Sequence, residues 1–274
     1  MSQKIKKEIK TGIISDFKVV SLVPSLTETF LSVGVNVVGR TRFCCHPIDR
    51  VKSIPIVGGT KQARWVRIKE LCPDLVVIDK EENPKSFSEH ESFNFAITHF
   101  SSLAAAGVEF FQLADKFPPD LAEKIAVIGS RYQSAYSTAQ KKHMEILGGV
   151  EESVERAVPA LLKWVKKPSK KIKQVLYLIW HDPWMTISQD TFIHSILSCL
   201  GLDVYLPRFE SKYPTIELSE FDPDHTLLLC ASEPFPFHKK TEIISELKYP
   251  AALVDGEVLS WFGIRNLQFM ERHL

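Results

Sequence analysis

The chain alternates between short apolar runs and longer stretches whose apolar residues recur every three or four positions. Runs with the length and composition of buried strands lie at 17–23, 35–39, 75–79, 108–111, 177–180, 226–230 and 252–254. Stretches with helical spacing lie at 25–34, 64–71, 121–132, 190–200, 239–247 and from 259 onwards. Strands that alternate with helices predict an α/β fold with parallel sheets.

The first of these helices carries its own start and stop signals. Ser25 and Glu28 have the spacing of a capping box, in which the serine caps the helix and the glutamate reaches back to it. Gly34 follows the last apolar residue and is expected to end the helix. Capping employs both polar side chains, and it is the structural alternative to a ligand-binding role for Ser25.

The middle of the chain predicts one long helix. Apolar residues such as Leu147, Val154 and Leu161 recur at helical spacing across 134–167, which would span roughly 45 Å as a single helix. Glycines at 148–149 and Pro159 would bend or interrupt it, and the lysines at 166–171 would end it. We therefore expect an α/β lobe at 1–133, a linking helix at 134–170 and a second α/β lobe at 171–274.

Aromatic side chains gather where predicted strands end. Trp180 and Trp184 flank the end of the 177–180 run, and Trp261 and Phe262 form a second cluster of the same kind. In open α/β sheets, ligands bind beyond the carboxyl ends of strands, although such rings also fill cores. The pattern predicts an aromatic pocket between the lobes for a large, flat small molecule. Its expected ligand-binding residues are Pro24, Ser25, Phe43, Lys80, Trp180, Trp184, Tyr213, Glu233, Trp261, Phe262 and Arg265.

Charge and composition exclude several classes of function. The chain has 34 basic and 33 acidic residues and no basic stripe, so we expect no nucleic-acid partner. No apolar run is long enough to span a membrane. The basic N-terminus lacks the apolar region of a signal peptide, which places the sequence as given in the cytoplasm, or in the periplasm if a leader was removed.

Metal and catalytic chemistry have weak sequence signals. The five cysteines are an odd number with an adjacent pair, so we expect reduced thiols. Cys44, Cys45 and His46 are adjacent and lack the spacing of zinc ligands, which predicts no metal site. His181 beside Asp182 could orient a catalytic imidazole, but no nucleophile elbow, P-loop or GxGxxG motif accompanies it. We interpret His181 as part of the core or of a pocket wall, and the chain as a non-enzyme.

Several motifs in order resemble a known family. The segments 21–29, 38–44, 57–61 and 73–76 resemble class III substrate-binding proteins with a helical backbone, which serve importers of vitamin B12, haem and ferric siderophores. The segments 80–83, 177–185, 190–193, 232–237 and 254–263 look like the branch usually labelled cobalamin-binding.

The resemblance implies two Rossmann-like lobes with a rigid linking helix and a monomer without a covalent cofactor. It places Phe43 and the 260–264 turn at the pocket, and it matches Trp180 and Trp184 to an aromatic loop. Acidic residues on the upper surface of each lobe dock the ABC permease in this family, and here Glu81, Glu82 and Glu233 are the candidates. The leading hypothesis is reversible binding of cobalamin or a related corrinoid, a small-molecule metal complex. The alternatives are a receptor for haem or a ferric siderophore, and a cytoplasmic corrinoid carrier, sensor or enzyme.

Overall fold

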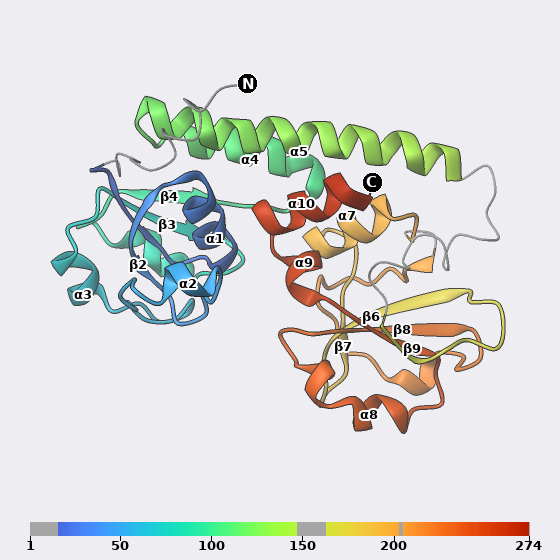
Figure 1. Cartoon of the computed structure of the whole chain (residues 1–274). Coiled ribbons are helices and arrows are strands. Elements are labelled where there is room, and N and C mark those ends of the chain that lie inside the picture. Colours follow the sequence, from blue (N-terminus) through green and yellow to red (C-terminus); the bar gives the residue numbers. More distant parts are fainter. Residues whose placement is uncertain (1–15, 147–162, 203–204, 274) are drawn as a thin grey trace. The chain divides into compact units, whose positions relative to one another are not determined.

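The computed structural model describes residues 16–146, 163–202 and 205–273, which separate into two compact units (Figure 1). Unit 1 contains residues up to Phe100, Gly107–Ser130 and Gly263–Arg265. Unit 2 contains Ser101–Ala106, Arg131–Phe262 and the remainder from Asn266. The predicted α/β fold is confirmed, because each unit is built on a sheet of its own with helices packed on it.

The sheet of unit 1 has four parallel strands in the order β2-β1-β3-β4. Its strands are β1 (Lys18–Ser21), β2 (Asn36–Arg40), β3 (Leu75–Asp79) and β4 (Phe95–Thr98). The helices associated with it are α1 (Pro24–Val33), α2 (Ile48–Val51), α3 (Trp65–Glu70) and α4 (Leu103–Ala114), the last of which begins in unit 2. Because the strands are parallel, the loops that follow them leave from one edge of the sheet.

Two sequence predictions for unit 1 are wrong. Helix α1 begins at Pro24 with Val23 as its N-cap and no side-chain cap, so Ser25 lies inside the first turn and the capping box does not form. The run at 108–111 is part of α4 rather than a strand, because its apolar residues also suit a buried helix. Gly34 ends α1 as predicted, with a left-handed φ of 84°.

The long helix of the chain begins earlier than its pattern predicts. Helix α5 runs over 28 residues, Pro119–Ile146, and so begins well before position 134. The proline suits the first turn, where its missing N–H is not needed. Much of the predicted helix, residues 147–162, lies outside the described residues. Residues Lys163–Lys166 form strand β5, which corrects the prediction that the helix continues to the lysine run.

The sheet of unit 2 is mixed, with three parallel strands at its centre and an antiparallel strand at each edge. Its order is β5-β9-β8-β6-β7, and the strands beside β5 are β6 (Gln174–Trp180), β7 (Met185–Thr186), β8 (Thr226–Ala231) and β9 (Ala251–Val254). Its helices, besides the end of α5, are α7 (Phe192–Cys199), α8 (Thr241–Ser245), α9 (Gly256–Ser260) and α10 (Ile264–His273). The predicted parallel strands thus form the centre of this sheet, and an antiparallel strand that the sequence did not predict lies at each edge.

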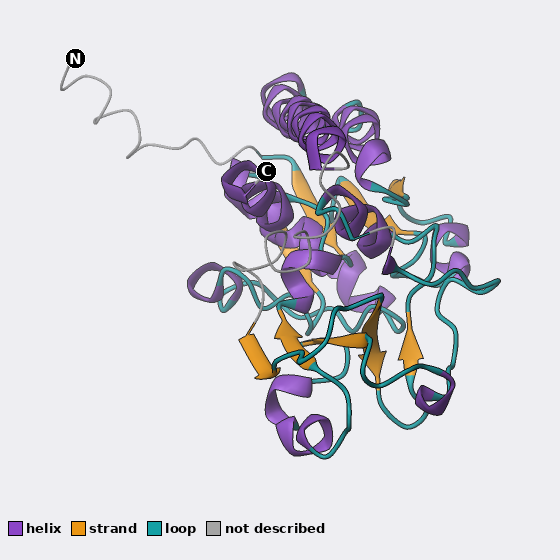
Figure 2. Cartoon of the chain, turned by 90° about the vertical axis from the view of Figure 1, so that its right-hand side faces the viewer, coloured by secondary structure: helices purple, strands orange, loops and turns teal. Residues whose placement is uncertain are grey.

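Helices cover both faces of this sheet. Helix α8 lies on one face, while α7 and α9 lie on the other (Figure 1), and Figure 2 shows helices on both sides of the sheet. Alternate residues of β6 follow the same division: Leu176 and Leu178 join the core cluster that includes Ile244 of α8. Tyr177 therefore faces the side of α7 and α9.

Candidate functional site

An aromatic turn follows the carboxyl end of β6 in unit 2. Strands β6 and β7 pair through Trp180 and Met185, and residues 181–184 form the turn between them. Asp182 adopts a left-handed φ of 61° within it, a conformation that aspartate tolerates better than most residues. The tight reversal leaves Trp180 with 40% of its surface exposed.

Five rings meet at this turn, and we call them the Trp180 cluster. Its members are Trp180, His181, Trp184, Phe235 and Phe237. Trp180 meets Phe235 edge to face at 5.7 Å, and Phe235 in turn lies 4.7 Å from the fully buried Phe237. Such edge contacts favour fixed ring orientations. The cluster therefore anchors an exposed indole to the core of unit 2.

The two tryptophans of the turn have different environments. Trp184 is half-buried, packs against the apolar core and lies parallel to Phe237 at 6.2 Å between ring centroids. Trp180 is the more exposed of the two. The prediction that both residues wall a pocket remains untested, but the structure gives Trp184 a part in the core of unit 2.

His181 contributes a ring to the cluster. Its imidazole meets Trp184 edge to face at 4.6 Å and lies 5.6 Å from Phe235. Within the part of the chain that the structure describes, no carboxylate is hydrogen-bonded to it. The ring therefore belongs to the Trp180 cluster, and its place in a pocket wall stays a prediction.

Tyr213 and Glu233 also belong to this edge of unit 2. Tyr213 is exposed, and its neighbour Thr215 forms a β-bridge with Met185 beside the aromatic turn. Glu233 is half-buried after β8, and its Oε1 accepts a hydrogen bond from the Ser260 hydroxyl at 3.1 Å. Both predicted residues thus lie on loops that border the carboxyl ends of β6 and β8.

The second aromatic pair follows α9. Trp261 is half-buried, whereas Phe262 is buried and meets Phe192 of α7 edge to face at 6.0 Å. Phe262 is therefore a packing residue of unit 2, and of the pair Trp261 has more of its surface available for contacts.

In unit 1, the loop after β2 presents an exposed ring. Phe43 has 48% of its surface exposed, and the Arg42 guanidinium lies 4.8 Å above its centroid. The loop is held from inside by Arg40, which is buried and donates hydrogen bonds to the carbonyls of Thr41, Cys44 and Val51 at 2.8–3.0 Å. The buried Arg40 holds this loop in place. Sequence analysis did not predict this role, because the sequence of β2 indicates only a strand.

Other predicted contacts of unit 1 differ in exposure. Pro24 and Ser25 are buried at the start of α1, while Lys80 is exposed after β3. Arg265 is engaged by Glu28 through two hydrogen bonds, from Nε to Oε2 at 3.0 Å and from one terminal nitrogen to Oε1 at 2.9 Å. Glu28, predicted to cap α1, thus pairs with Arg265 instead.

The acidic candidates of unit 1 surround a buried carboxyl at the end of β3. Asp79 accepts hydrogen bonds from the Thr98 hydroxyl and the Glu81 amide at 2.9 Å, and burial raises its pKa. Burial also raises the pKa of Glu82, and the charge of Asp79 adds to this effect. Glu81 is exposed, with His99 Nε2 3.5 Å from its Oε1. Among these acids, Glu81 is the most accessible.

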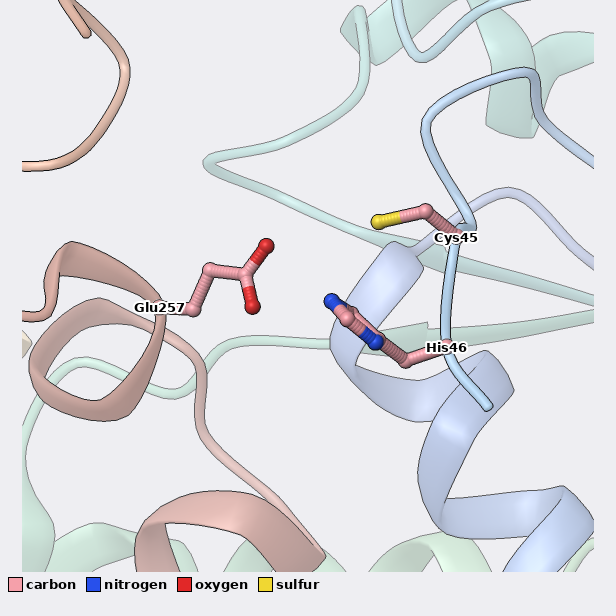
Figure 3. Close-up of side chains that lie close together, drawn as sticks. All are labelled: Cys45, His46 and Glu257. Carbon is pink, nitrogen blue, oxygen red and sulfur yellow. The ribbon is translucent and has the colours of Figure 1, made fainter. Parts of the chain in front are cut away.

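Potential metal ligands are present in both units. Figure 3 shows Cys45 and His46 on the loop after β2 in unit 1, and Glu257 on α9 in unit 2. Cys45 and His46 are adjacent in sequence, and the side chains of adjacent residues rarely bind the same metal ion. Cys45 is exposed and is one of five cysteines that form no disulfide.

None of the described helices combines the length and apolar character needed to cross a membrane.

No protein-family model matches the chain, and no curated protein does so either. Solved structures do match over nearly the whole chain. The periplasmic vitamin B12-binding protein BtuF of Vibrio cholerae has a TM-score of 0.64 at 13% identity, covering 93% of this chain and 94% of its own.

Haem-binding proteins match equally well. S. aureus IsdE complexed with heme has a TM-score of 0.67 at 14% identity, covering 94% of this chain and 97% of its own. A periplasmic heme-binding protein from Pseudomonas aeruginosa has a TM-score of 0.66 at 15% identity, with 93% and 90% covered. The chain therefore has the two-lobe α/β fold of substrate-binding proteins, as the sequence resemblance implies. At such low identity the likeness establishes the fold alone, and the cobalamin-binding branch is one of several among these neighbours.

Proposed function

We propose that this chain is a non-enzymatic substrate-binding protein that delivers a corrinoid to an ABC importer outside the inner membrane. The observation that carries the proposal is the Trp180 cluster, an exposed indole anchored at the carboxyl end of β6. Ligands of open α/β sheets bind at this edge, and a flat macrocycle buries its face well against such rings. The fold shared with periplasmic vitamin B12- and haem-binding proteins supports the same class of ligand.

Charge favours a corrinoid over an anionic ligand. The segments 180–185 and 233–237 contain two acidic residues, Asp182 and Glu233, and no lysine or arginine. Carboxylates accept hydrogen bonds from neutral amide side chains, which corrinoids carry at their rim, but they repel the carboxylates of haem or of an anionic siderophore. A corrinoid therefore suits the unit 2 loops better.

A titration tests this proposal. Purified protein is mixed with cyanocobalamin, cobinamide, haem or a ferric siderophore, and visible absorbance and intrinsic tryptophan fluorescence are followed. We expect cobinamide or cobalamin to quench fluorescence and raise the melting temperature. No response to either corrinoid at high micromolar concentration would overturn the proposal.

Two variants locate the binding surface. Trp180→Ala should weaken binding by about 30-fold or more, as expected for a central contact, while changing stability little because the indole is already exposed. Trp65→Ala is the matched control, because Trp65 packs against Phe87, Phe93 and His90 in unit 1. It should lower stability and leave affinity unchanged if the folded fraction is kept high. Equal losses of affinity in both variants would argue against a site at Trp180.

Haem is the second candidate, and His181 is the observation that favours it. Imidazole is a common axial ligand of haem iron, and this ring is half-buried in the Trp180 cluster. Haem binding through His181 would give an intense absorbance band that His181→Ala shifts or removes. A corrinoid site would leave haem binding weak and insensitive to this substitution.

Docking to a permease would use acidic side chains. Glu81 is exposed in unit 1, whereas Glu82 is half-buried there and Glu233 is half-buried in unit 2. We propose Glu81 as the principal contact of unit 1, since an arginine of a partner can reach it without desolvating other groups. Glu81→Arg should abolish stimulation of a reconstituted importer while ligand affinity stays unchanged.

A further inference from the structure

One buried side chain joins three segments of unit 1. The amide oxygen of Asn83 accepts a hydrogen bond from the backbone N–H of Asp79 at 2.8 Å. Its amide nitrogen donates to the backbone carbonyls of Leu22 at 3.2 Å and Thr60 at 2.9 Å. Leu22 directly follows β1, Asp79 ends β3, and Thr60 belongs to the loop over 57–61. Asn83 therefore ties the ends of two strands to a neighbouring loop.

These three partners require a side-chain amide. The residues that carry the backbone groups are buried, so each group needs a partner from the protein. Asparagine supplies an acceptor and two donors from one planar group. Exchanging its oxygen and nitrogen would set a donor against the N–H of Asp79 and an acceptor against both carbonyls, so only one orientation makes all three bonds. An aspartate has the same shape but lacks the donors when it is ionised.

The same side chain closes the turn that follows β3, residues 79–83, which we call the β3 turn. The backbone N–H of Asn83 donates back to the Asp79 carbonyl at 2.9 Å. The Asp79 carboxylate accepts from the Glu81 amide at 2.9 Å, and Lys61 Nζ donates to the Glu81 carbonyl at 3.1 Å. The backbone of Glu81 is thus held through both its amide and its carbonyl, while the residue remains exposed.

We propose that Asn83 positions the β3 turn for docking to the permease. The inference rests on the proposed function, in which the exposed Glu81 is the principal docking contact of unit 1. A side chain on a fixed backbone loses less conformational entropy when it pairs with an arginine of the partner, so a fixed turn strengthens docking. Because Asn83 is buried, it acts through Glu81 rather than by touching the partner, which makes it a positioning residue.

The first test measures docking in two variants that carry the same chemical change. Asn83→Asp keeps the acceptor for the Asp79 amide and loses both donors. Asn94→Asp is the matched control, because Asn94 is exposed, donates to the Asp74 carbonyl at 3.4 Å, and gains the same charge in unit 1. We expect Asn83→Asp to weaken binding to the permease of a reconstituted importer, held in nanodiscs, by about 10-fold. Asn94→Asp should leave this binding unchanged, and equal losses in the two variants would overturn the proposal.

A double-mutant cycle separates positioning from a general structural effect. If Asn83 acts through Glu81, then Asn83→Asp causes no further loss of permease binding once Glu81→Ala is present. The same loss in both backgrounds would overturn the proposal. A loss in Glu81→Ala without one in Asn83→Asp would overturn the role of Asn83 alone. No loss in Glu81→Ala would overturn the docking role of Glu81, and the role of Asn83 with it.

Hydrogen exchange tests the positioning without the permease. Peptides over 57–61 and 79–83 should exchange faster together in Asn83→Asp and at the wild-type rate in Asn94→Asp. The wild-type protein supplies a readout that stands even if a variant folds poorly. The side-chain amide hydrogens of Asn83 should persist in nuclear magnetic resonance spectra after transfer to D2O, because both donate to carbonyls of buried residues. Exchange as fast as that of the exposed Asn94 side chain would overturn the proposal.

Discussion

The ion pair between Glu28 and Arg265 gives a quantitative test of how burial sets the value of a salt bridge. Both members belong to unit 1, and their side chains are 16% and 23% exposed. Unit 2 contains a pair with the same forked geometry, Arg131 and Glu271, with bonds of 2.8 and 2.7 Å and exposures of 37% and 38%. Geometry is therefore matched, and burial is the main difference.

The expected magnitudes follow from that difference. Charge-assisted hydrogen bonds shielded from water contribute about 1.5–3 kcal/mol, so we expect a coupling free energy near 2 kcal/mol for Glu28 and Arg265. An exposed pair contributes about 0.2–1 kcal/mol, which is the range for Arg131 and Glu271. In a domain of this size, about 2 kcal/mol corresponds to a fall in melting temperature of roughly 4–8 °C.

The assay is a double-mutant cycle at each pair. Both residues are replaced by alanine singly and together, and unfolding by urea is measured at low salt and at 1 M NaCl. The coupling at Glu28 and Arg265 should exceed that at Arg131 and Glu271 and should lose less in high salt, because buried charges are screened less. Equal couplings, or equal salt sensitivity, would refute the argument from burial.

Three further outcomes are expected. Gly263→Ala should destabilise unit 1 by more than 2 kcal/mol in urea melts, since φ is +115° and a Cβ would lie 2.2 Å from Thr29 Oγ1. Arg131 lowers the pKa of Glu271, so the stability difference between wild type and Glu271→Gln should persist at neutral pH and vanish as pH falls below about 4. A chromogenic thiol reagent should label Cys45 and Cys72 rapidly and the three buried cysteines slowly; uniform rates would contradict this.

The strand pattern predicted much of the fold because buried strands have a local signature. The runs at 75–79, 226–230 and 252–254 all coincide with strands, since residues buried on both faces read as continuous apolar stretches. The same signature gave a wrong prediction at 108–111, because an apolar segment of a helix cannot be told from a buried strand over four residues. Strand β4 was missed because Phe95–Thr98 offers only three apolar residues, and Asn94 and His99 flank the strand.

Long-range partners explain the errors at the site. Ser25 and Glu28 match a capping box in sequence, but Glu28 pairs with Arg265, which lies 237 positions away. The apolar positions around Val165 fit a helical period, yet the residues beside it pair with β9 across the sheet. No local window contains these partners, so periodicity and spacing cannot reveal them.

The aromatic residues show which part of the candidate site a sequence can indicate. Trp180 ends strand β6 and Phe43 follows strand β2, and both are exposed, so the sequence located two exposed rings at strand ends. How firmly each ring is held depends on buried groups that look ordinary in sequence: Phe237 beneath the Trp180 cluster, and Arg40 beneath the loop of Phe43. Because rigid anchors reduce the entropy lost on binding, replacing Arg40 should weaken any ligand contact at Phe43 even though Arg40 is itself buried. Under the proposed function, ligand selectivity therefore depends on the groups that hold the contact residues as well as on the contact residues themselves.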